Sequence, residues 1–170
     1  MLRFVRRFRD CCGVASPVRA EGAQEASAPI PINKDTATVT VNLFADEYHN
    51  KPLDGAVTSA THLYGAFSAH FLHGKAPSVG KEVAVYYFPD TIVVDDNVGG
   101  DLIEGSGADA VKAGTWKIEN NKAIFTFNES WLKDNPADIY VAANFSFELA
   151  NKDTGSGSSA IVEFPGAGSI

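Results

Sequence analysis

Apolar residues recur at every second position over most of the chain after residue 35, which is the period of a β-strand with one buried face. In residues 36–44, for example, Val39, Val41 and Leu43 alternate with polar side chains. Clusters of Gly, Asn, Asp and Pro separate the alternating runs and are typical of turns. The runs that predict further strands are residues 61–73, 79–88, 92–94, 114–127, 139–149 and 160–164.

The clearest local prediction is a hairpin over residues 114–127. Its two alternating runs meet at Asn120 and Asn121, and asparagine tolerates the positive φ that a tight hairpin turn requires. We expect Trp116, together with Phe125 and Phe127 on the second run, to lie in the core.

Together the runs predict an all-β fold, an antiparallel β-sandwich of seven or eight strands. Two segments interrupt the pattern. Residues 95–109 are rich in Gly and Asp and are expected to form a loop. Residues 129–138 predict one helical turn around Trp131 and Leu132, which Pro136 ends.

The chain is expected to hold one domain between two flanking segments, because 170 residues suffice for one hydrophobic core. Residues 1–33 combine a basic start, a short apolar stretch and an Ala-, Glu- and Pro-rich segment. They predict a degenerate signal-like leader followed by a flexible stalk, and a leader that directs nothing is the alternative. Residues 34–166 then form the sandwich binding domain, and residues 167–170 a tail or linker stub.

Charge and cysteine content exclude several classes of protein. The net charge is −7, and Lys and Arg form no cluster outside the first twenty residues, so nucleic acid is not an expected partner. No apolar run predicts a membrane span. The only cysteines, Cys11 and Cys12, are adjacent, and neighbouring cysteines rarely bridge each other, so no disulfide framework is expected.

Catalytic motifs are absent from the sequence, which contains no phosphate-binding glycine loop, nucleophile elbow or zinc-spaced Cys/His set. We therefore expect neither an enzyme nor a cofactor. A small hydrolase is the enzymatic alternative, with Glu82, Asp90 and Glu104 as the candidate carboxylates.

Two small groups of residues are candidates for binding. Tyr48, Tyr64 and Trp131 are the aromatic side chains that we expect to contact a ligand if they are exposed. Asp95 and Asp96 offer oxygen ligands to calcium, but their spacing matches no known calcium loop, so a solvated acidic loop is the favoured interpretation.

Several segments carry a family resemblance: LYGAFSAHF (63–71), VGKEVAVYYFPD (79–90), GTWKIE with AIFTFN (114–119 and 123–128) and VEFPG (162–166). In this order they resemble the N-terminal immunoglobulin-like adhesion domain of Gram-positive bacterial cell-wall surface adhesins. The resemblance covers residues 36–166 and implies an immunoglobulin-like sandwich, a location at the cell surface or cell wall, and further domains of a longer surface protein. It also implies a non-catalytic module that binds a host or partner protein. A carbohydrate-binding module with a glycan ligand and a structural stalk or pilin-like domain are the alternatives.

The same resemblance raises the question of an internal isopeptide bond, which such domains often form between Lys and Asn beside a buried carboxylate. It implies Glu82 as that carboxylate and Asn144 as the acceptor. Residues 36–44 contain no lysine, which leaves Lys34 or Lys51 as the donor at the edges of the strand. We therefore expect that no bond forms.

Overall fold

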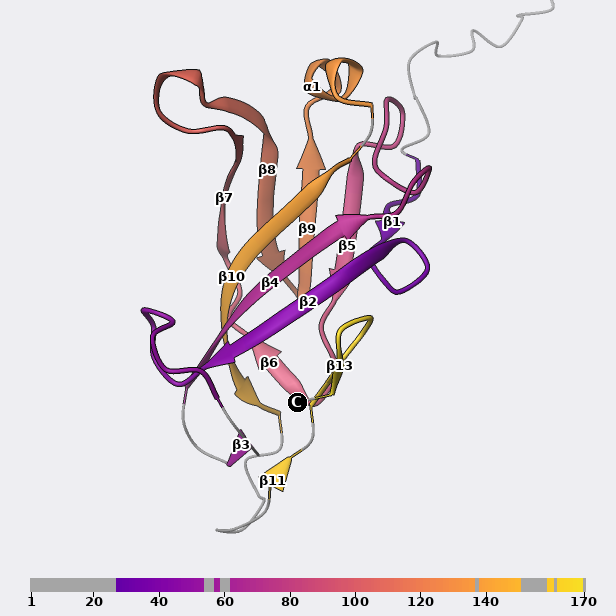
Figure 1. The fold of residues 1–170 in the computed structure, drawn as a ribbon. Coiled ribbons are helices and arrows are strands. Elements are labelled where there is room, and N and C mark those ends of the chain that lie inside the picture. Colours follow the sequence, from indigo (N-terminus) through magenta and orange to yellow (C-terminus); the bar gives the residue numbers. More distant parts are fainter. Residues whose placement is uncertain are drawn as a thin grey trace, which may run out of the picture.

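The computed structural model of the chain describes residues 27–53, 57–58, 62–136, 138–150, 159–160 and 162–169. In this part of the chain, two sheets of five and four strands pack together (Figure 1). The larger sheet has the order β1 (Ile30–Pro31), β5 (Val83–Tyr87), β9 (Lys122–Phe127), β8 (Val111–Glu119) and β7 (Val98–Glu104). The smaller sheet has the order β2 (Ala37–Phe44), β4 (Leu63–Phe71), β10 (Tyr140–Leu149) and β6 (Ile92–Val94). The prediction of an all-β sandwich is confirmed.

Shorter elements complete the described chain. They are β3 (Val57–Thr58) paired with β11 (Ser159–Ala160), β12 (Glu163–Phe164) paired with β13 (Gly168–Ser169), the 3-10 helix η1 (Gly107–Asp109) and the helix α1 (Glu129–Asp134). Within the two main sheets every pairing is antiparallel except that of β1 with β5. Neither helix of the described residues is long and apolar enough to cross a membrane.

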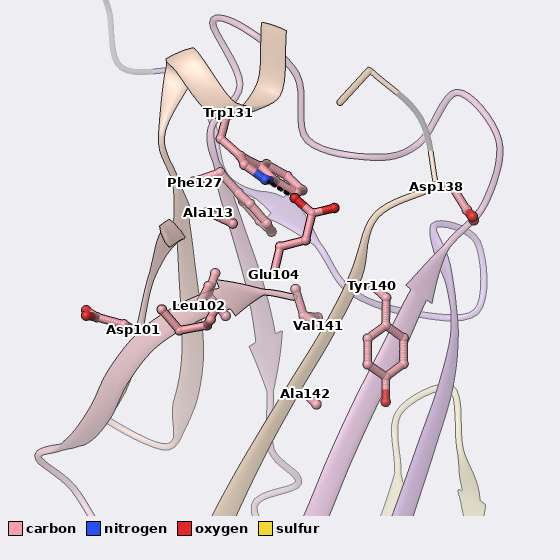
Figure 2. A pocket seen from close by; sticks show the side chains of 11 residues that line it. Asp101, Leu102, Glu104, Ala113, Phe127, Trp131, Asp138, Tyr140, Val141 and Ala142 are labelled. Atoms are coloured by element: carbon pink, nitrogen blue, oxygen red, sulfur yellow. Dashed lines mark hydrogen bonds between the residues drawn. The ribbon is translucent and has the colours of Figure 1, made fainter. Parts of the chain in front are cut away.

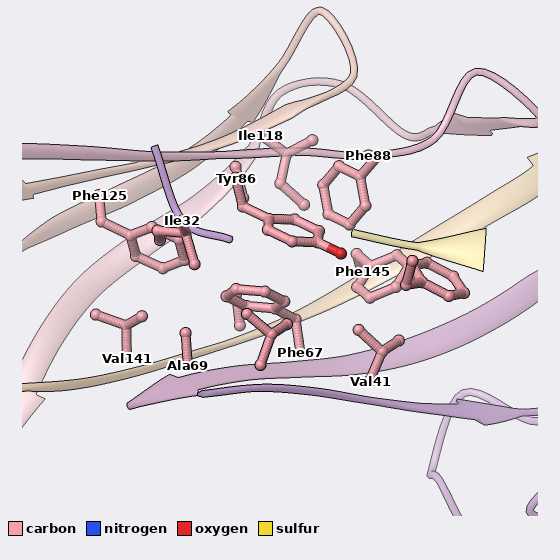
Figure 3. Packing of buried hydrophobic residues seen from close by; sticks show 14 of the residues in the cluster. Ile32, Val41, Phe67, Ala69, Tyr86, Phe88, Ile118, Phe125, Val141 and Phe145 are labelled. Carbon is pink, nitrogen blue, oxygen red and sulfur yellow. The ribbon is translucent and has the colours of Figure 1, made fainter. Parts of the chain in front are cut away.

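The core lies between the two sheets and is built by the alternation read from the sequence. The predicted inward residues of β2 are buried, as are the five alternate residues of β4 from Leu63 to Phe71, and the residues between them face outward. Aromatic rings fill the centre: the ring of Phe67 lies 4.5 Å from that of Tyr86, and the ring of Phe88 lies 4.8 Å from that of Phe145 (Figure 3). Gly65 on β4 is required there, because a Cβ at this position would collide with the Phe145 ring.

The predicted hairpin is β8–β9, with Asn120 and Asn121 at φ of 52° and 58°. Asn121 also joins the two sheets. Its side-chain nitrogen donates to the carbonyls of Pro89 and Ile92 at 3.3 and 3.2 Å, and its side-chain oxygen accepts from the N–H of Val94 at 3.0 Å. One turn residue therefore holds the β8–β9 turn against β6 of the other sheet.

Several expectations differ from the structure. The segment expected to be a loop contains the strand β7, although Gly99 and Gly100 disfavour a strand. Pairing with β8 overrides that preference, and the indole of Trp116 takes up the space beside Gly100, where a Cβ would lie 3.3 Å from its Nε1. Trp116 is therefore half-buried and packs against the core from its margin, and is not a fully buried core residue.

The strands also extend past the predicted domain limits. Ile30–Pro31 pairs with β5, and Ile32 is buried and donates its N–H to the carbonyl of Val85 at 2.8 Å, so the fold begins before Lys34. At the other end, Gly168–Ser169 pairs with β12 inside the segment predicted to be a tail. With β1 and β7 included, the two sheets hold more strands than the seven or eight expected.

Candidate binding groove between two strand edges

A groove of about 450 Å³ opens on the side of the sandwich where β7 faces β10 (Figure 2). Leu102, Ala113, Phe127 and Val141 are buried and form its apolar floor. The other lining residues are Asp101, Ile103, Glu104, Trp131, Asp138, Tyr140 and Ala142.

One wall of the groove is an unpaired edge of β10. The N–H of Phe71 donates to the carbonyl of Ile139 at 3.0 Å, so this pair is hydrogen-bonded in the register that joins β10 to β4. Because hydrogen-bonded positions alternate in an antiparallel ladder, Tyr140, Ala142 and Asn144 direct their N–H and C=O groups away from β4. On that side β6 pairs only with the end of β10, Phe147–Leu149, and within the described chain no strand pairs with residues 140–144.

The opposite wall is β7, which is the last strand of the five-stranded sheet and has no neighbour beyond it in the described residues. Its pairing with β8 shifts register between Leu102 and Ile103, as at a β-bulge. The groove is thus bounded by two strand edges that carry free backbone donors and acceptors.

The groove is closed at one end and open at the other. Between β6 and β7 the chain crosses from one sheet to the other, where the N–H of Asp95 donates to the carbonyl of Ser146 and the N–H of Asn97 to that of Ile118, both at 3.0 Å. The other end, called the open end below, is lined by Trp131 of α1 and by Glu104 at the end of β7 (Figure 2). An extended segment that enters there can lie in line with β6, next to residues 140–144, over roughly 14–17 Å at ~3.4 Å per residue.

Helix α1 places Trp131 at the open end. Leu132 is buried and anchors the helix to the core. Glu129 accepts a hydrogen bond from Lys133 one turn later, which raises the pKa of the Lys133 ammonium. The indole of Trp131 stacks on Phe127 with 5.8 Å between ring centroids, and its Nε1 donates to Glu104 Oε2 at 2.6 Å. This bond ties the helix to the end of β7.

The three aromatic candidates do not share one site. Trp131 lines the open end of the groove, whereas Tyr64 lies at the start of β4 with its ring edge-on to His62, 5.4 Å between centroids. Tyr64 pairs in register with Ser146, near the opposite end of β10 from Tyr140. Tyr48 is 78% exposed and lies in the segment that follows β2. The three candidates, of which Tyr64 is only half exposed, therefore lie on separate elements and do not form a flat row for sugar stacking.

The isopeptide candidates are also apart. Asn144 is exposed on the outer face of β10, and Glu82 precedes β5 in the other sheet, where its carboxylate accepts from the N–H of Gly80. Lys34 is exposed in the turn that leads into β2, and Lys51 is exposed after that strand. No charged side chain of the described chain is buried, so the buried carboxylate that this chemistry requires is not found there.

The two calcium candidates act as hydrogen-bond acceptors within the fold. Asp95 accepts from the hydroxyl of Ser146 and lies 3.1 Å from Nε2 of His62. Asp96 Oδ1 accepts from the N–H of Asn120 at 2.9 Å, at the β8–β9 turn. Among the residues that the structure describes, no group of three or more His, Cys, Asp or Glu is placed to hold a metal ion.

The hydrolase alternative gains no support from the positions of its carboxylates. Glu82 lies next to β5 and Glu104 ends β7, and both β9 and β8 lie between those two strands. Asp90 follows the other end of β5.

Sequence reasoning named Trp131 as a contact residue and Glu104 only as a possible catalytic carboxylate. It missed the wall formed by Tyr140 and Ala142, because their alternation marks an outward face and does not show that one strand edge is unpaired. Comparisons with models of known protein families, with curated proteins and with solved structures found no match for this chain.

Proposed function

We propose that the protein is a non-catalytic adhesion module that binds an extended segment of a partner protein in the β7–β10 groove by strand addition. The observation that carries this proposal is the unpaired edge of β10, where Tyr140 and Ala142 present backbone N–H and C=O groups to the groove and Asn144 continues the same edge. A guest strand there gains main-chain hydrogen bonds from the edge and apolar contacts from the floor.

The resemblance to cell-wall adhesion domains agrees with this function and supports a place at the bacterial cell surface, with a host or partner protein as the ligand. A glycan ligand finds less support, because the three aromatic candidates lie on separate elements. A structural stalk domain does not require a groove bounded by two unpaired strand edges, so this alternative also has less support.

A short peptide of alternating valine and threonine is the probe for strand addition, with binding to the full chain followed by the fluorescence of Trp131 and Trp116 and by amide chemical shifts. We expect the largest shifts at Tyr140, Ala142 and Asn144. Methylation of the peptide nitrogens that face β10 removes the donors, so we expect it to abolish binding, whereas methylation of the alternate nitrogens should not.

The matched protein variant is Ala142→Pro. The N–H of Ala142 faces the groove and not β4, so proline removes a donor that the fold itself does not use. We expect a folded protein that no longer binds the peptide. Equal affinity of a folded Ala142→Pro variant, or equal binding of both methylated peptides, would show that no strand is added at this edge.

A further inference from the structure

The open end of the groove is acidic on both walls. Glu104 ends β7 on one side, and Asp138 lies just before β10 on the other, with no Lys or Arg among the residues described as lining the groove. Asp101 also belongs to the lining, but it pairs with Lys112 Nζ at 2.7 Å and points away from Glu104 and Trp131 (Figure 2). Glu104 and Asp138 are therefore the two acidic lining residues that pair with no Lys or Arg of the described chain. Of these, the Glu104 carboxylate lies beside Trp131, whereas the Asp138 carboxylate is directed away from Glu104 toward His70 (Figure 2).

Each of these carboxylates has one oxygen engaged and one available. Glu104 Oε2 accepts from the indole of Trp131, and Asp138 Oδ1 contacts Nε2 of His70. The second oxygen of each carboxylate has no hydrogen-bond partner in the described chain. Glu104 also lies next to the Trp131 indole (Figure 2), and a carboxylate beside an aromatic ring suits an ammonium or guanidinium group.

From this geometry, and resting on the strand addition proposed above, we infer that the partner segment carries a basic side chain, arginine or lysine, where it passes Glu104 and Trp131, with Asp138 adding a second negative charge nearby. The rest of the segment alternates. Opposite residues of an antiparallel pair point to the same face, so guest residues across from Val141 are apolar and face the floor. The basic residue lies across from Tyr140, on the exposed side.

The direction of the guest fixes which end carries the charge. The strand β6 already runs antiparallel to β10, and a guest in line with it continues the same pairing. Since β10 begins at the open end, an antiparallel guest ends there. The basic residue is therefore close to the C-terminal end of the bound segment.

Four versions of the valine–threonine peptide test this inference on the full chain. They carry arginine near the C-terminal end, neutral citrulline at the same position, arginine near the N-terminal end, or no substitution. We expect the first peptide to bind about tenfold more tightly than the other three at low ionic strength. This difference in affinity should shrink as salt is added.

The protein variant Glu104→Gln with Asp138→Asn removes both charges and keeps the fold. Gln retains an oxygen that can accept from Trp131, and Asn tolerates the positive φ of 66° at position 138. We expect the arginine peptide to bind this variant no better than the citrulline peptide. The control Asp90→Asn with Glu163→Gln makes the same charge change at exposed sites outside the groove lining and should keep the tenfold gap.

The outcomes separate this inference from the function on which it rests. If all four peptides bind equally, strand addition stands and the basic partner is refuted. If none binds at millimolar concentration, both are refuted. A concentration-dependent dimer in sedimentation that the peptides do not displace would identify a second copy of the chain as the occupant and would also overturn the inference.

Discussion

Replacement of Tyr86 by phenylalanine tests how the core of this sandwich treats a polar group. The Tyr86 side chain is fully buried, and its hydroxyl points between the rings of Phe88 and Phe145 (Figure 3). That hydroxyl has no hydrogen-bond partner among the described residues. A buried hydroxyl without a partner costs about 1–3 kcal/mol, so we expect Tyr86→Phe to raise the free energy of unfolding by about 1 kcal/mol at pH 7.

The same variant should respond differently to alkaline pH. Burial disfavours the charged phenolate and raises the pKa of Tyr86 in the folded protein above the value of about 10 in the unfolded chain. Because the unfolded chain therefore ionises at a lower pH than the folded protein, this residue has no pH-dependent effect on stability below pH ~10, and the wild type loses stability as pH rises from there toward the folded-state pKa. At pH 11 the wild type should therefore lose about 1.4 kcal/mol that the variant keeps.

Urea denaturation at pH 7, 9 and 11 measures both effects, and Tyr87→Phe is the matched control because Tyr87 is half exposed on the opposite face of β5. The control should not show the gain at neutral pH, because the Tyr87 side chain is half exposed. A Tyr86→Phe protein less stable than the wild type at pH 7 would mean that the hydroxyl has a hydrogen-bond partner. A difference in stability between Tyr86→Phe and the wild type that stays constant up to pH 11 would mean that Tyr86 ionises in the folded state as it does in the unfolded chain.

Three further predictions concern the margins of the fold. Ile32→Ala should lower the free energy of unfolding by about 2–4 kcal/mol in urea, since Ile32 is buried although it lies before the predicted domain; an unchanged midpoint would place residues 30–32 outside the cooperative unit. Asn121→Gly keeps the turn but loses two hydrogen bonds to β6 and one to Pro89 before it, so we expect a loss of about 1–3 kcal/mol by thermal denaturation, against little change for Asn120→Gly. The intact mass of the protein should show no loss of one ammonia, because Lys34, Glu82 and Asn144 lie apart; such a deficit, persisting in Asn144→Ala, would point to another acceptor.

Local alternation was sufficient to predict most of the strands. Val39, Val41 and Leu43 on β2 face the core as their spacing requires, and the positive φ of Asn120 and Asn121 follows from asparagine's tolerance of that conformation. The single turn of α1 was also readable, because Pro136 lies just beyond its end.

The strand β7 and the groove depend on contacts between distant segments and were not readable. Two adjacent glycines lower the strand propensity of residues 98–104. The strand forms because β7 pairs with β8 and because the indole of Trp116 packs beside Gly100. The free edge of β10 exists because β6, some fifty residues earlier in the chain, is too short to pair along its whole length. No pattern within residues 139–149 indicates that part of the strand edge is left unpaired.

The two ends of the five-stranded sheet differ in their ability to accept another strand. At the β1 end, Pro31 has no N–H, and its carbonyl already accepts a hydrogen bond from the hydroxyl of Thr36 at 2.6 Å. At the β7 end, backbone groups are unpaired within the described chain. Fibre growth through this sheet would require both ends to accept a strand. Two copies that meet edge to edge through β7 therefore form a closed pair whose outer edges are both blocked by proline, so polymerisation through this sheet stops at that pair.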